Sequence, residues 1–140
     1  MGGGSPTASP TASPTAKPTV LVADDNEDIR MLLRVLLDAS GTFDVTGEAA
    51  NGTDAIALAE SLQPDLAVLD VAMPQIGGVQ AVAEVRRVSP GTRIALLSGF
   101  DAGDTAKSAG AHGADVYITK GTAPDDLVAI LADLAGVTVG

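Results

Sequence analysis

Short apolar runs alternate along the chain with longer segments in which apolar residues recur every three or four positions. The runs are too short for helices and are bounded by turn residues, which is typical of strands buried in a sheet. The longer segments have the spacing of one buried helix face. We therefore predict five strands, at residues 19–23, 43–49, 66–70, 94–98 and 116–119. Strands that alternate with helices need right-handed crossovers, so the pattern predicts an α/β fold, a doubly wound, five-stranded parallel sheet with five helices.

Capping and breaking residues bound the predicted helices. The first follows Asn26, a good N-cap, and ends at Gly41. Its buried face is expected to consist of Ile29, Leu32, Leu33, Leu36 and Leu37. The other helices are expected from Asn51-Gly52 to Pro64, from Gly77-Gly78 to Pro90, between Asp101 and His112, and from about Pro124. The segment between Asp101 and His112 has only alanine as apolar filling and contains two glycines, so its helix is expected to be the least stable.

Composition agrees with a domain of this class. The chain has 140 residues, 46% of them hydrophobic, and no apolar run long enough to span a bilayer, so we expect one soluble domain and no membrane insertion. It has no cysteine, which excludes disulfides and cysteine-bound metal, and no visible signal peptide, so the cytoplasm is the expected location. A net charge of −10 with only eight Lys and Arg opposes direct nucleic-acid binding by this chain.

The beginning of the chain differs in composition from the rest. Ser-Pro-Thr-Ala occurs three times from Ser5, and a segment of Gly, Ser, Pro, Thr and Ala cannot bury a core. We therefore expect residues 1–17 to be a disordered linker or tag and residues 18–136 to form the folded domain. Residues 137–140 are expected to be a short C-terminal tail.

Acidic residues follow two of the predicted strands. Asp24 and Asp25 come directly after the first strand, and Asp70 ends the apolar run of the third. Because the carboxyl ends of parallel strands meet at one edge of a sheet, the three carboxylates are expected to lie close together. Such a cluster is tolerated only if a cation binds or some acids stay protonated, and oxygen ligands suit Mg²⁺. The alternative for Asp24 and Asp25 is that they only cap the helix that follows.

Two further strands end in polar residues, Ser98 and Lys120. The same edge of the sheet would then hold an acid cluster, a hydroxyl and a cation. A carboxylate can attack phosphorus, while an ammonium and a hydroxyl can stabilise the charged oxygens of a phosphoryl group. The four strand ends therefore favour phosphoryl transfer, with Asp70 as the nucleophile.

These residues together resemble the receiver domain of two-component response regulators, from about Thr19 to Leu134. The resemblance rests on an ordered set of positions: Asp24-Asp25 after the first strand, Asp70 followed by Met73-Pro74 and Gly78, Ser98 followed by Gly99, and Gly113-Ala114 and Tyr117 before Lys120. It implies a flavodoxin-like receiver sandwich with strand order 2-1-3-4-5. Residues 48–52 and Lys120-Gly121 are similar to receivers that usually carry a helix-turn-helix output domain.

The resemblance also implies a metal site and a chemical role for each acid. Asp70 would be the phosphoacceptor and a ligand of Mg²⁺. Asp25 would bind the ion directly, Asp24 through water, and the backbone carbonyl of Ala72 would complete the protein ligands. The phosphoryl group would come from a sensor histidine kinase or a phosphotransfer protein.

The remaining implied residues belong to the switch. Ser98 would hydrogen-bond the phosphoryl group, Lys120 would pair with it, and the Tyr117 ring would change rotamer together with Ser98. The face formed by residues 101–112, the fifth strand and the last helix would then bind the partner or a second copy of the chain. The family often has proline after the lysine, and with Gly121 here we expect a trans peptide, because a cis bond without proline costs about 2.5–4 kcal/mol.

Other functions fit the sequence less well. A receiver-like interaction module that works without phosphorylation is the main rival. An aspartyl-phosphate hydrolase of the haloacid dehalogenase type needs a second acid two residues after its nucleophile, where Ala72 stands. The sequence lacks the phosphate-binding loops that flavin sites and P-loop nucleotide sites require. We interpret Arg86-Arg87 as a solvated helix face and assign no chemistry to His112.

Overall fold

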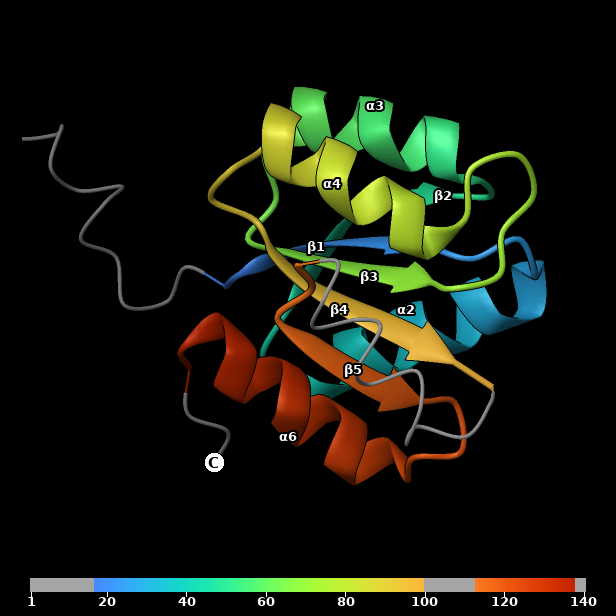
Figure 1. Ribbon diagram of the computed structural model, residues 1–140. Coiled ribbons are helices and arrows are strands. Elements are labelled where there is room, and N and C mark those ends of the chain that lie inside the picture. Colours follow the sequence, from blue (N-terminus) through green and yellow to red (C-terminus); the bar gives the residue numbers. More distant parts are fainter. Residues whose placement is uncertain (1–16, 100–112, 138–140) are drawn as a thin grey trace, which may run out of the picture.

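A computed structural model describes residues 17–99 and 113–137. Strands and helices alternate along these residues, with one helix after each of the first three strands (Figure 1). Their bounds are β1 Thr19–Ala23, α2 Glu27–Ser40, β2 Asp44–Ala49, α3 Gly52–Leu62, β3 Leu66–Asp70, α4 Gly78–Val88, β4 Arg93–Ser98, β5 Val116–Thr119 and α6 Pro124–Ala135. The helix expected between residues 101 and 112 lies outside the described residues.

The five strands form one parallel sheet in the order β2-β1-β3-β4-β5, so the predicted order is confirmed. α3 and α4 cover one face of the sheet, and α2 and α6 cover the other (Figure 1). β3 lies in the middle, between β1 and β4, and all five of its residues are buried. This two-sided burial explains why its sequence is apolar up to the final Asp70.

The core has two layers because neighbouring residues of each strand point to opposite faces of the sheet. Val20, Val22, Leu66 and Val68 pack against α2 and α6. Leu21, Ala23 and the odd-numbered residues of β3 pack against α3 and α4. The sheet is thereby held rigidly from both sides, which fixes where its strand ends lie.

The predicted caps of the first helix are confirmed. The Asn26 side chain accepts hydrogen bonds from the backbone N–H of Asp28 at 2.9 Å and of Ile29 at 3.3 Å. Gly41 ends the helix in the left-handed conformation, at φ 72°. Asn26 is thus the N-cap, so the acid pair before it is not needed to cap the helix.

The apolar faces of the helices were predicted only in part. On α2, Leu33 and Leu37 are buried, but Leu32 is 60% exposed, so its predicted burial is wrong. Leu62, in the last turn of α3, is 39% exposed. In both cases the helix contacts the sheet along a narrow stripe, and an apolar residue at the edge of that stripe stays in solvent. None of the helices in the described part of the chain is long and apolar enough to cross a membrane.

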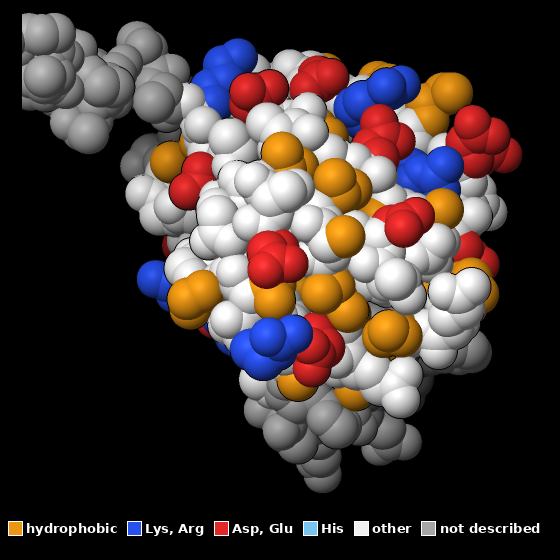
Figure 2. All heavy atoms as spheres, turned by 90° about the horizontal axis from the view of Figure 1, so that it is seen from above, with side chains coloured by type: hydrophobic (Ala, Val, Ile, Leu, Met, Phe, Trp, Pro, Cys, Tyr) orange, Lys and Arg blue, Asp and Glu red, His pale blue; other side chains and the backbone are white. Residues whose placement is uncertain are grey.

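The interpretation of Arg86 as a solvated residue is also wrong. From α4 its guanidinium donates hydrogen bonds to the carbonyls of Gly113, at 2.6 and 3.1 Å, and of Thr92, at 3.1 Å. It also pairs with the Asp115 carboxylate at 2.7 Å. Arg87 pairs with Glu84 one turn away, as the prediction for a helix surface requires. The face made by α3 and α4 carries acidic and basic side chains interspersed with apolar ones (Figure 2).

Candidate functional site

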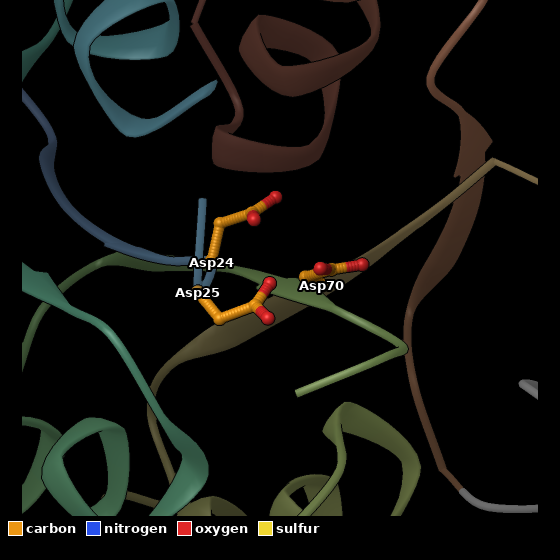
Figure 3. Close-up of side chains that lie close together, drawn as sticks. All are labelled: Asp24, Asp25 and Asp70. Atoms are coloured by element: carbon orange, nitrogen blue, oxygen red, sulfur yellow. The ribbon is translucent and has the colours of Figure 1, made fainter. Parts of the chain in front are cut away.

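The three predicted acids meet at the carboxyl edge of the sheet (Figure 3). Asp24 and Asp25 follow β1, and Asp70 is the last residue of the neighbouring strand β3. One carboxylate oxygen from each lies within 4.8 Å of the other two. Asp24 is fully buried and Asp70 is 3% exposed, whereas Asp25 is open to solvent. The cluster therefore consists of two buried acids, Asp24 and Asp70, and one solvent-exposed acid, Asp25, at its mouth.

Lys120, directly after β5, brings a positive charge to the two buried acids. Its Nζ lies 3.2 Å from Asp24 Oδ2 and 3.3 Å from Asp70 Oδ1. Burial disfavours the charged ammonium, but the neighbouring carboxylates of Asp70 and Asp24 outweigh this, so the pKa of Lys120 is raised. The lysine therefore remains a cation at neutral pH.

The Asp70 carboxyl has a pKa above its usual range. Burial is the main cause, because it penalises the charged form, and the negative charge of Asp24 adds to it. The N–H of Ala72, which donates to Asp70 Oδ1 at 3.2 Å, and the Lys120 ammonium act in the opposite direction. Asp70 is thus a buried carboxylate whose cost of burial the Lys120 ammonium and the Ala72 N–H offset only in part.

The loop after Asp70 is held close to α4. A Cβ atom on Gly78 would clash with the Asp70 carbonyl oxygen, and the Gly78 N–H donates to the Val71 carbonyl at 3.0 Å. A residue with a side chain at this position would push the loop away. The glycine eight residues after the acid is therefore required by the close approach of the two backbones.

The predicted switch residues lie on the neighbouring strands. Ser98 ends β4 and is buried, and its carbonyl accepts a hydrogen bond from the Lys120 N–H at 2.6 Å. Tyr117 on β5 is partly buried, and its hydroxyl is buried with no hydrogen-bond partner in the described residues. The peptide between Lys120 and Gly121 is trans, as predicted.

The donor set agrees with a hard divalent cation. It consists of carboxylate oxygens, which Mg²⁺ prefers, and the buried Oδ2 of Asp24 accepts no hydrogen bond from the described residues although Lys120 lies nearby. The backbone of Ala72 follows in the same loop, and its exposed side chain leaves the mouth of the cluster open. Asp24, Asp25 and Asp70 therefore fit a magnesium ion.

One residue beside this site was missed by sequence reasoning. Arg30, on the first turn and a half of α2, donates a hydrogen bond from NH1 to the Asp24 carbonyl at 2.7 Å. Its position among the charged residues of α2 gives no signal of this contact. The only clue in the sequence is its proximity to the acid pair.

Comparison with known proteins agrees with this geometry. The family model for the response regulator receiver domain matches residues 20–132. The chain is 35% identical over 109 residues to the transcriptional regulatory protein YxjL of Bacillus subtilis, covering 78% of this chain and 50% of that protein. It is 36% identical over 116 residues to the nitrate/nitrite response regulator NarL of Escherichia coli, covering 83% and 54%.

The chain thus spans about half the length of these curated relatives. Among solved structures, the signal receiver domain of a NarL response regulator from Mycobacterium tuberculosis superposes with a TM-score of 0.81 at 33% identity, covering 86% of this chain and 97% of that one. The predicted closeness to receivers of transcriptional regulators is confirmed by these relatives. The chain belongs to the response regulator receiver domain family.

Proposed function

We propose that this receiver domain is a signalling switch that accepts a phosphoryl group on Asp70. The observation that carries the proposal is the position of Asp70 at the end of the central strand, 3.3 Å from the Lys120 ammonium and within 4.8 Å of two further carboxylates. A nucleophile, a cation and two further acids beside them are what an aspartyl-phosphate site requires.

The chain's own residues account for most of the transfer. An oxygen of the Asp70 carboxylate attacks the phosphorus of a phosphodonor, the bond from phosphorus to the leaving group breaks, and an acyl phosphate forms on Asp70. Lys120 stabilises the negative phosphoryl oxygens, and the hydroxyl of Ser98 donates a hydrogen bond to one of them. Mg²⁺, held by Asp24, Asp25, Asp70 and the Ala72 carbonyl, would neutralise the charge that the incoming group adds to the acid cluster.

The new charge at Asp70 gives Ser98 and Lys120 a stronger acceptor, so both move toward it. Displacement of Ser98 makes room for the Tyr117 ring, whose hydroxyl has no partner to hold it among the described residues. The output face therefore includes β5 and α6, and a downstream partner or a second copy of the chain binds there. Residues 101–112, which the sequence analysis assigns to the same face, lie outside the described residues.

The phosphodonor is a sensor histidine kinase or a phosphotransfer protein, and the switch works in the cytoplasm. Three apolar side chains of α2 support a docking face near the site: Met31, Leu32 and Val35 are 50%, 60% and 55% exposed. A groove beside them is lined by Leu32, Pro124 and Lys120 among others. Leu32→Ser should slow phosphorylation by a protein donor and leave phosphorylation by a small-molecule donor unchanged.

The central test is treatment with a small phosphodonor and Mg²⁺, followed by intact-mass measurement. The wild-type chain should gain one phosphoryl group, Asp70→Asn should gain none, and Asp133→Asn, which removes an exposed acid on α6, should behave as wild type. Excess chelator should abolish the modification. Equal labelling of Asp70→Asn would overturn the assignment of the acceptor.

The second candidate is a receiver-like module that binds its partner without phosphorylation. It predicts no mass increase under any of these conditions. The intact cluster of acids and lysine argues against it, since a module of this kind has no use for two buried carboxylates beside a single ammonium.

A further inference from the structure

Building on the proposed function, we infer that Arg30, oriented by Glu48, is a positioning residue for the magnesium site. It acts on the backbone between the two acids that follow β1, and it touches neither the phosphoacceptor nor the incoming phosphoryl group. Three contacts carry the inference: a hydrogen bond to the Asp24 carbonyl, an ion pair with Glu48, and the burial of the guanidinium.

The hydrogen bond from Arg30 NH1 to the Asp24 carbonyl is short, at 2.7 Å. Its donor is charged, and such bonds are stronger than those between neutral groups. The Arg30 side chain is only 16% exposed, although arginine is seldom buried without a partner. A long side chain held in one place beside an acid cluster indicates that the backbone there needs the support.

Glu48, near the end of β2, holds the other side of the guanidinium. Its Oε1 lies 3.6 Å from Arg30 Nε, and its Oε2 lies 3.4 Å from Arg34 NH1. Glu48 therefore sits between two arginines that are one helical turn apart. Arg34 is 46% exposed, and among the described residues it pairs with Glu48 but not with the three acids of the cluster.

The other atoms of Asp24 are also fixed. Its N–H donates to the Ala49 carbonyl of β2 at 3.0 Å, and its Oδ1 accepts from the Asn26 N–H at 2.9 Å. The carbonyl oxygen of Asp24 and the Cα of Asp25 belong to one planar peptide unit. Because Arg30 fixes that oxygen, it also restricts where the exposed carboxylate of Asp25 can stand.

The positive charge of Arg30 should lower magnesium affinity, whereas its positioning of the Asp24 backbone should raise it. Because the two effects are opposite, the inference can be tested. A positive charge close to the site repels a divalent cation. If charge were its only influence, its removal would strengthen magnesium binding. If positioning dominates, its removal weakens binding, because groups that orient metal ligands typically contribute about 10- to 100-fold in affinity or activity.

The experiment compares Arg30→Met with Arg34→Met in the full chain. Both variants remove one arginine and one partner of Glu48 from the same helix, but only Arg30 contacts Asp24. Magnesium affinity is measured by calorimetry at constant ionic strength. Hydrogen exchange of the Asn26 amide, which donates to Asp24, is measured without metal, and thermal unfolding checks that each variant folds.

We expect magnesium binding at least about 10-fold weaker and Asn26 exchange faster in Arg30→Met, with Arg34→Met within twofold of wild type. Glu48→Gln should also make Asn26 exchange faster, in smaller measure, and this exchange decides the question if Arg30→Met does not fold, because loss of the Glu48 charge weakens magnesium binding by itself. Unchanged or tighter magnesium binding in Arg30→Met or, if that variant does not fold, unchanged Asn26 exchange in Glu48→Gln would overturn the inference. Failure of the wild-type chain to bind magnesium would instead overturn the proposed function, while the exchange measurement would still report on the contact between Arg30 and Asp24.

Discussion

Replacing Asp70 by asparagine should stabilise the fold in the absence of metal. Asp70 is 3% exposed, and its nearest acid, Asp24, is fully buried. With an effective dielectric constant of about 20, two carboxylates within 4.8 Å of each other repel by at least about 3.5 kcal/mol, and the Lys120 ammonium at 3.3 Å attracts by about 5 kcal/mol. Asp25, which is exposed and screened, adds a smaller repulsion, so the charges nearly cancel.

The cost of burying the Asp70 carboxylate then decides whether the substitution raises or lowers the free energy of unfolding. Removing an ionised carboxylate from water costs several kcal/mol even after relaxation, and no charge in the described residues compensates this at Asp70 beyond Lys120. In the variant Lys120 keeps its contact with Asp24, and the asparagine oxygen can still accept from the Ala72 N–H. We expect Asp70→Asn to raise the free energy of unfolding by about 1–2 kcal/mol, which is roughly 3–8 °C in Tm.

The effect should depend on pH and on magnesium. Because the folded protein holds the Asp70 proton more tightly than the unfolded chain does, the penalty is absent below the ordinary carboxyl pKa of 3.8 and grows as the pH rises toward the raised pKa of Asp70. To test this, the Tm of Asp70→Asn and of the wild-type chain is measured at pH 3 and at pH 7, with chelator or with about 10 mM Mg²⁺. The gap in Tm should vanish at pH 3 and narrow with Mg²⁺.

The matched control is Asp133→Asn, which removes the same charge from an exposed site on α6 and should change stability by less than about 0.5 kcal/mol. A lower Tm for Asp70→Asn than for wild type at pH 7 with chelator would refute the reasoning. It would mean that the ion pair with Lys120 outweighs the cost of burial.

Three further substitutions test other parts of the structure. Asp25→Asn should abolish the rise in Tm that Mg²⁺ gives the wild-type chain, and an undiminished rise would show that Asp25 is not a metal ligand. Arg86→Met should destabilise the fold by about 1.5–3 kcal/mol in denaturant unfolding, because it leaves backbone carbonyls without their charged donor, whereas Arg87→Met on the surface should have little effect. Gly78→Ala should cost about 1–3 kcal/mol and slow phosphorylation, because its Cβ would displace the phosphoacceptor loop. Gly91→Ala, where a Cβ meets nothing within 4 Å, is its control, and equal stability of the two alanine variants would contradict the steric argument.

The fold could be predicted because its signals are local. The strand of residues 66–70 is apolar up to its final Asp70 since helices cover both faces of the sheet, and helix bounds follow from caps such as Asn26 and Gly41. The convergence of Asp24, Asp25 and Asp70 follows from the same rule, because parallel strands end at one edge. Periodicity does not tell how wide a stripe of each helix contacts the sheet, so the exposed Leu32 was wrongly predicted to be buried.

The two arginines show where sequence reasoning stops and why. Arg30 and Arg86 each occupy a helix position that looks solvated, yet each reaches backbone carbonyls at the sheet, Arg30 at the carboxyl end of β1 and Arg86 beside the first residues of β4 and β5. A carbonyl just beyond a strand has no ladder partner of its own, and if it is shielded from water it needs a donor. A guanidinium can supply that donor from a neighbouring helix, because its long stem buries along the core while its head stays polar. The contact depends on how a helix packs against the sheet, and it leaves no periodic pattern in the sequence. The roles of Arg30 and Arg86 are therefore visible only in the structure.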